Sequence, residues 1–121
     1  MDDQTFEKLV EDAIENIPPE FRTILDNVDI TVADEPTYYQ RSKLRLHNGV
    51  LLLGLYEGVP QTKRGSSYTF VLPDKITIFK NPILHLFQTP EKIKDHVRLT
   101  VLHEIGHHFG LSDEAMRKIG K

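Results

Sequence analysis

The chain has 121 residues, and its 15 Lys and Arg against 18 Asp and Glu give a formal net charge of −3 at pH 7. This length predicts one domain over residues 1–121 with a single hydrophobic core. The acidic balance argues against a nucleic-acid partner, and the lack of cysteine excludes disulfides and thiolate metal sites.

No segment has the pattern of a targeting or membrane-spanning sequence. The N-terminus is acidic, whereas a signal peptide has a basic start followed by an apolar stretch. The longest apolar run, residues 50–55, is interrupted by Gly54 and is far shorter than the ~20 residues that cross a bilayer. We therefore expect a cytoplasmic protein with no membrane partner.

The first third of the chain predicts two helices and a strand. Residues 5–16 carry apolar side chains at helical spacing, which indicates an amphipathic helix. Two prolines end this helix, and the second, Pro19, suits the first position of another short helix. Residues 28–32 alternate in polarity as a half-buried strand does. The polar residues 33–43 are expected to be irregular, either a loop over the site or a long connection.

The middle of the chain predicts a buried strand over residues 50–56 and a flexible loop over residues 58–67. Five basic residues crowd this region, and we interpret them as a solvated hairpin, with a polyanion site as the alternative. They are Arg41, Lys43, Arg45, Lys63 and Arg64.

Residues 75–79 alternate again and predict a further strand. Residues 81–88 form a connecting turn or short helix in this interpretation. Thr89 can cap a helix and Pro90 suits its first position, so a long helix is expected over residues 90–109.

This last helix carries His103, Glu104 and His107 in an HExxH pattern. Residues four apart share a helix face, so both imidazoles can reach one metal ion. The Glu104 carboxylate can take a proton from a metal-activated water and pass it to a leaving amine. Gly110 tolerates the left-handed conformation that ends a helix, which lets Asp113 return with an oxygen ligand. The pattern predicts a zinc peptidase site.

Alternatives remain for several of these residues. The HExxH pattern also occurs by chance in metal-free helices. Asp113, together with Ser112, could instead cap a short final helix. His108 leaves the ligand face and is expected to support the site or to pack, although it could replace Asp113 as a ligand. His96 lies about 10 Å from His103 by helical rise, too far to bind the same metal ion, and is expected on the surface or the cleft wall.

With these residues, the chain resembles the small zincin-like metallopeptidase family, described as a minimal zincin fold. The likeness rests on residues 98–114, which contain HExxHxxGxxD, and on residues 73–80. It implies an α+β domain in which a small mixed sheet packs against the active-site helix and N-terminal helices. It also implies one Zn²⁺ bound by residues matching His103, His107 and Asp113, a general base matching Glu104, and a peptide or protein substrate.

The resemblance also suggests that residues 75–80 form the sheet edge on which an extended peptide is laid, with an ordinary strand as the alternative. Larger relatives, the metzincins, add a methionine turn well downstream, and Met116 lies too close to Asp113 to match it. Tyr39, Tyr56 and Tyr68 are candidates, by residue type alone, for the donor that stabilises the oxyanion.

The expected function is hydrolysis of peptide bonds through a metal-activated water with Glu104 as general base. The alternative is a catalytically vestigial zinc-binding module that binds a protein partner. Glu104 favours the enzyme, because a purely structural zinc site does not need it. Nothing in the sequence indicates the substrate or the oligomeric state.

Overall fold

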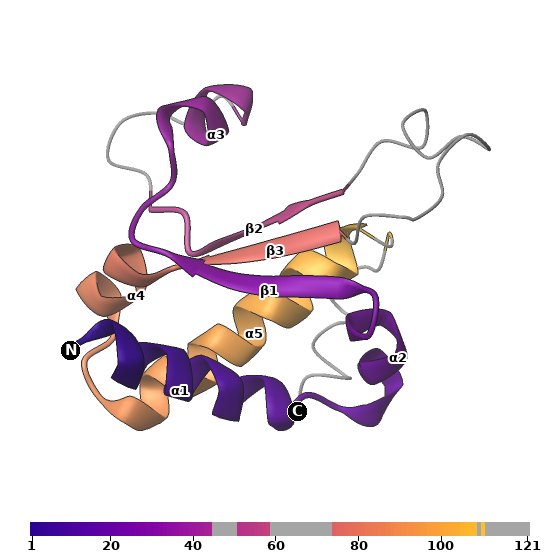
Figure 1. Cartoon of the computed structure of the whole chain (residues 1–121), viewed down its shortest axis with the longest axis horizontal. Helices are drawn as coiled ribbons and strands as arrows, with labels where there is room; N and C mark the ends of the chain where they lie inside the picture. Colours follow the sequence, from indigo (N-terminus) through magenta and orange to yellow (C-terminus); the bar gives the residue numbers. More distant parts are fainter. Residues whose placement is uncertain (45–50, 59–73, 109, 111–121) are drawn as a thin grey trace.

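A mixed three-stranded sheet with helices packed against it forms the fold (Figure 1). The computed structural model describes residues 1–44, 51–58, 74–108 and 110. The strand order is β1 (Val28–Ala33), β3 (Asp74–Phe79) and β2 (Gly54–Glu57). β1 runs parallel to β3, and β2 runs antiparallel to it with Tyr56 opposite Ile76. The predicted α+β class with a small mixed sheet is confirmed.

The central position of β3 corrects one sequence-based hypothesis. The resemblance suggests residues 75–80 as the sheet edge, but β3 lies between β1 and β2. Its residues Ile76, Thr77, Ile78 and Phe79 are all buried, so both of its faces are covered. A strand that is buried on both faces suits the middle of a sheet. Of the three described strands, β2 is therefore the edge strand nearest the site.

Helix α1 (Asp3–Glu15) packs against α5 (Pro90–His108) on one side of the sheet (Figure 1). It buries Phe6, Val10 and Ala13, which follow the predicted apolar stripe. The helix begins earlier than the predicted residue 5, because the Asp2 carboxylate accepts a hydrogen bond from the Thr5 N–H at 2.8 Å and caps it.

Helix α5 carries the HExxH pattern and ends at His108, close to the predicted boundary. Thr89 caps it, since its hydroxyl oxygen accepts a hydrogen bond from the Lys92 N–H at 3.3 Å. One face of α5 is buried in the core through Ile93, Val97, Val101, Leu102 and Ile105. None of the described helices is long and apolar enough to cross a membrane.

Shorter helices complete the described part. The predicted second helix is present as a 3₁₀ turn, η1 (Pro19–Phe21), followed by α2 (Arg22–Leu25). The connection after β3 is helical, as α4 (Lys80–Leu86). The buried Lys80 ammonium donates a hydrogen bond to the Asp3 carboxylate at 2.6 Å, which ties α4 to α1.

Helix α3 (Tyr38–Lys43) corrects the prediction of an irregular stretch over residues 33–43. Thr37 and Gln40 form a reciprocal capping box, which nucleates this short helix despite its polar composition. The Gln40 side-chain amide also donates a hydrogen bond to the Glu57 carboxylate at 2.9 Å, which ties α3 to β2.

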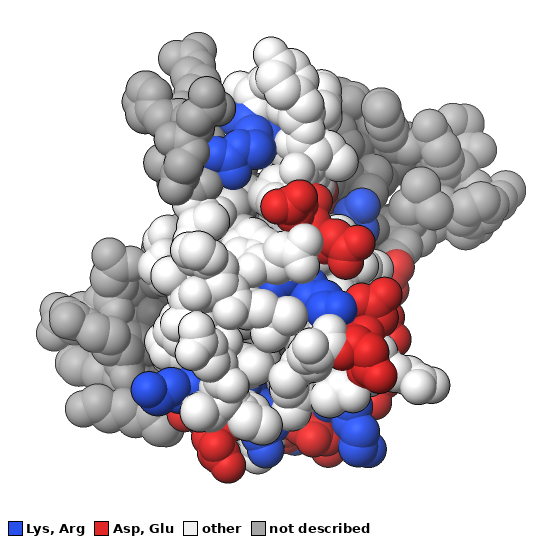
Figure 2. All heavy atoms as spheres, turned by 90° about the vertical axis from the view of Figure 1, so that its left-hand side faces the viewer, with Lys and Arg blue, Asp and Glu red and all other residues white. Residues whose placement is uncertain are grey.

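The hairpin interpretation of the basic cluster is wrong for Arg41 and Lys43, which lie in α3. The other three basic residues, Arg45, Lys63 and Arg64, lie outside the described residues. Figure 2 shows basic and acidic side chains interspersed over one face, without a large basic patch among the described residues seen there.

Candidate active site

The last turns of α5 bring three of the predicted site residues together. The imidazole rings of His103 and His107 lie with their centroids 4.0 Å apart, at an angle of 62°. Both side chains are exposed, and Glu104 beside them is half-buried. The two imidazoles therefore share one face of the helix, as their spacing of four residues predicts, and Glu104 lines the same cleft.

The Glu104 carboxylate is fixed by the neighbouring strand. The main-chain N–H of Tyr56 in β2 donates a hydrogen bond to Glu104 Oε1 at 2.8 Å. This contact leaves Oε2 without a hydrogen-bond partner among the described residues. Sequence reasoning singled out Tyr56 only for its phenol and missed this amide, because any residue type could supply it.

A glycine allows β2 to lie so close to α5. A Cβ atom added to Gly54 would lie 2.6 Å from Thr100 Cγ2 and 3.3 Å from the Thr77 carbonyl oxygen. The first of these distances is shorter than real contacts, so only glycine fits here without a shift. Glycine within a strand often marks such a close approach of the backbone.

The side chain of Tyr56 joins two further elements. Its hydroxyl donates a hydrogen bond to Asp74 Oδ2 at 2.6 Å, at the start of β3. Its ring stacks on His108, with centroids 3.9 Å apart and planes 18° from parallel. His108 therefore packs beside the site, as one of its two predicted roles requires. Sequence analysis gave Asp74 no role of its own, although it lies in the stretch of residues 73–80 that carries part of the resemblance.

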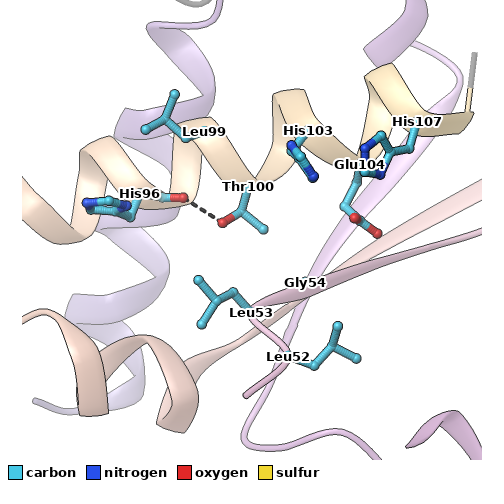
Figure 3. Close-up of a pocket in the computed structure, with 9 residues that line it drawn as sticks. All are labelled: Leu52, Leu53, Gly54, His96, Leu99, Thr100, His103, Glu104 and His107. Atoms are coloured by element: carbon cyan, nitrogen blue, oxygen red, sulfur yellow. Dashed lines mark hydrogen bonds between the residues drawn. The ribbon is translucent and has the colours of Figure 1, made fainter. Parts of the chain in front are cut away.

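A cleft of about 430 Å³ runs along α5 beside these residues (Figure 3). His103, Glu104 and His107 lie at one end and His96 at the other, which spans about 16 Å by helical rise. The ring of His96 stacks on Phe87 with centroids 3.7 Å apart. His96 thus belongs to the cleft wall, as predicted. The remaining lining residues are Leu52, Leu53, Gly54, Leu99 and Thr100.

A second hollow, of about 340 Å³, adjoins the cleft at Glu104 and His107. It shares Leu52, Glu104 and His107 with the cleft. Leu44, Leu55, Tyr56 and His108 complete its lining. Glu104 and His107 therefore line both hollows, which together could accommodate an extended molecule.

Gly110 has the predicted left-handed conformation, with φ of 75°. Its N–H donates a hydrogen bond to the His107 carbonyl at 3.2 Å and so ends the helix. Asp113, the predicted third ligand, and Ser112 lie outside the described residues. Within the described part of the chain, no three His, Cys, Asp or Glu side chains are grouped to hold a metal ion.

The three tyrosines proposed as oxyanion donors differ in their surroundings. Tyr39 is 70% exposed on α3. The hydroxyl of Tyr56 donates to Asp74. Tyr68 lies outside the described residues. The role of oxyanion donor therefore stays a prediction for all three.

A family model for zincin-like metallopeptidases matches residues 25–121. The chain belongs to this zincin-like metallopeptidase family. The matched segment contains the whole three-stranded sheet of this zincin-like protein, the HExxH helix α5 and Asp113, whereas α1 precedes it. A comparison with curated proteins gave no significant match.

Proposed function

We propose that this zincin-like chain is a zinc-dependent peptidase in which His103, His107 and Asp113 hold Zn²⁺ and Glu104 is the general base. The observation that supports it most is the position of the Glu104 carboxylate. It lies beside two neighbouring imidazoles, in an open cleft, and the adjacent strand orients it. A general base needs this placement within reach of its proton donor.

The donor set fits zinc. Two neutral imidazoles and one carboxylate are a common ligand set of catalytic zinc, which keeps a further position open. The two histidine rings are already adjacent, with centroids 4.0 Å apart. When bound, zinc would supply a Lewis acid that polarises a peptide carbonyl and makes water more acidic.

The residues of the cleft would bind and orient the substrate. In an antiparallel pair, alternate residues turn their main-chain groups away from the partner strand. The Leu53 carbonyl accepts from the Phe79 N–H at 2.9 Å, so Gly54 presents its groups on the outer edge of β2. An extended peptide could pair there with little dependence on its sequence. Leu52, Leu53 and Leu99 make the cleft suitable for apolar side chains.

Glu104 would hold and move the proton. Its Oε1 is engaged by the Tyr56 N–H, so Oε2 is the atom that would accept a proton from water and return it to the leaving amine. A glutamine side chain at this position could lie in the same place and accept the same hydrogen bond, but it could not take up the proton.

The alternative function is a catalytically vestigial zinc module that binds a protein partner along β2. The same outward main-chain groups of β2 support it, because strand addition does not require catalysis. A purely structural zinc site would not need Glu104, so the enzyme is favoured.

The test compares the parent protein with Glu104→Gln for zinc content and for cleavage of a mixed peptide pool. We expect the variant to keep its zinc and to lose cleavage by about 100-fold or more, the contribution typical of a general base. Glu91→Gln, in the first turn of the same helix, is the matched control and should cleave normally. Zinc without any cleavage by the parent would favour the binding module, and protein without zinc would contradict both functions.

A further inference from the structure

We propose that Tyr56 is a positioning residue for the general base, acting through its main-chain N–H while its side chain fixes where that N–H lies. This inference rests on the proposed peptidase function, since it assigns how Glu104 is held. The 2.8 Å hydrogen bond from the Tyr56 N–H to Glu104 Oε1 is its first support.

The Tyr56 N–H can make this hydrogen bond without giving up a hydrogen bond between β2 and β3. Residues that alternate with Tyr56 face β3, as shown by the 2.9 Å hydrogen bond from the Phe79 N–H to the Leu53 carbonyl. The Tyr56 N–H therefore faces α5 and needs a partner there. A free glutamate side chain has several rotamers, and the rigid strand amide selects the one in which Oε1 faces β2.

The side chain of Tyr56 is held from two directions. Its hydroxyl donates to Asp74 Oδ2 at 2.6 Å, and its ring stacks on His108 at 3.9 Å between centroids. Asp74 begins the central strand, and His108 follows His107 in the last turn of α5. One residue thus connects the base, the central strand and the turn of helix that bears a predicted ligand.

This role differs from that of an oxyanion donor. The Tyr56 hydroxyl is engaged by Asp74, so removing it should loosen the strand amide rather than delete a contact with substrate. Loss of the positioning contact should therefore lower kcat, with KM and bound zinc little changed. If Tyr56 had a merely structural role, its substitution would lower the stability of the protein and would not lower kcat selectively.

The first experiment does not depend on activity. Amide hydrogen exchange, measured by NMR on the full chain, compares the parent with Glu104→Ala. Exchange at Tyr56 should accelerate roughly tenfold, because the amide loses a hydrogen bond to a charged acceptor. The Leu55 amide, which faces β3, is the internal control and should not change. Equal protection of Tyr56 in both proteins would overturn the proposed contact.

The second experiment separates the amide from the side chain. Tyr56→Ala keeps the N–H, whereas Tyr56→Pro removes it, and proline is tolerated on an edge strand where the N–H faces away from the ladder. We expect kcat of the proline variant to be about tenfold or more below that of the alanine variant, the usual cost of losing a supporting hydrogen bond at a metal site. Equal kcat values would overturn the role of the amide.

The third comparison replaces the second one if the proline variant does not fold. Tyr56→Phe keeps the amide and the ring but loses the hydroxyl, and Tyr38→Phe, at a phenol 88% exposed, is its control. A lower kcat with unchanged KM and zinc content is expected for Tyr56→Phe alone, and kcat equal to the parent would contradict the positioning role. If the parent cleaves no peptide, the proposed function fails, whereas the exchange experiment still decides the Tyr56 to Glu104 contact.

Discussion

Gly110 is the residue on which we expect the approach of Asp113, the third predicted ligand, to depend. Its φ of 75° lies in the left-handed region, and a Cβ added there would meet no described atom within 4 Å. Glycine is therefore required here by backbone conformation and not by space. Its N–H donates a hydrogen bond to the His107 carbonyl at the end of the helix.

Gly110→Ala should weaken zinc binding. The left-handed conformation costs an L-residue about 1–2 kcal/mol, which corresponds to roughly tenfold in affinity if binding requires that conformation. Gly110→Asn is the matched variant and should lose less, because asparagine adopts this conformation more easily. Competition with a chromogenic chelator measures the affinity. Equal affinities for the parent and the alanine variant would show that Asp113 does not reach zinc through this turn.

Gly54 in β2 and Thr100 in α5 together set the distance between these two elements. The glycine permits the close approach that brings the Tyr56 amide to Glu104. The Thr100 hydroxyl donates a hydrogen bond to the His96 carbonyl at 2.6 Å, which leaves its methyl group directed at Gly54. The geometry of the site therefore depends on the close packing of the Thr100 methyl group against Gly54, which has no side chain.

Gly54→Ala should lower kcat, because its methyl group would lie 2.6 Å from Thr100 Cγ2 and push β2 away. Thr100→Ser removes that methyl group and keeps the hydroxyl, so the double variant should recover most of the lost activity. The coupling free energy between the two positions should fall in the range of about 0.5–3 kcal/mol found for residues in contact. Additive effects in this double-mutant cycle would contradict the proposed steric conflict.

Helix α1 provides a pH-dependent element. Hydrogen bonds from the Thr5 side chain and the Thr5 N–H lower the pKa of Asp2 below its ordinary value of 3.8. Because the pKa is lowered on folding, this contribution to stability is present above the unfolded pKa and is lost as the pH falls through the folded pKa.

Asp2→Asn should remove this part of the pH dependence, since asparagine caps a helix without titrating. The thermal midpoint of the parent should fall more steeply below pH 4 than that of the variant, in the range set by the ordinary pKa of 3.8. Thermal unfolding followed by circular dichroism across this range tests it. Glu7→Gln, in the same helix, is a control for the change in net charge.

At the scale of the whole molecule, the sequence predicts helices better than it predicts the neighbours of each strand. Periodicity identified α1, the start signal at Thr89 and Pro90 identified α5, and the HExxH spacing correctly placed His103 and His107 on one face. These features depend on residues close in the sequence. The resemblance to the family rests chiefly on residues 98–114, whereas the family model matches residues 25–121.

Two of the features that sequence analysis missed are contacts between distant segments. The position of β3 in the sheet follows from pairing with residues far away in the chain, which local alternation does not encode. The hydrogen bond between Tyr56 and Glu104 joins residues 48 positions apart through a main-chain group. Helix α3 was missed because its capping box lies in a polar stretch without apolar periodicity.

The core that supports the site is built largely by α1 and α5. A substitution at Phe6 tests how much this core contributes to the stability of the protein. This side chain is fully buried, so Phe6→Ala should lower the free energy of unfolding by about 3–5 kcal/mol. Chemical denaturation measures the change, and zinc binding by the folded fraction should be unaffected. Glu7→Ala, on the exposed face of α1, is the matched control. A loss below about 1 kcal/mol would show that α1 contributes little to the core.

Helix α1 lies outside the segment that the family model matches, and this has one further consequence. The match begins at residue 25, yet α1 covers the buried face of α5. A fragment trimmed to residues 25–121 would expose the apolar face of α5 that α1 covers. It would also lose Asp3, the partner of the buried Lys80. A synthetic peptide of residues 1–24 should therefore reassociate with that fragment, so the molecule is a natural candidate for a split, two-piece reporter.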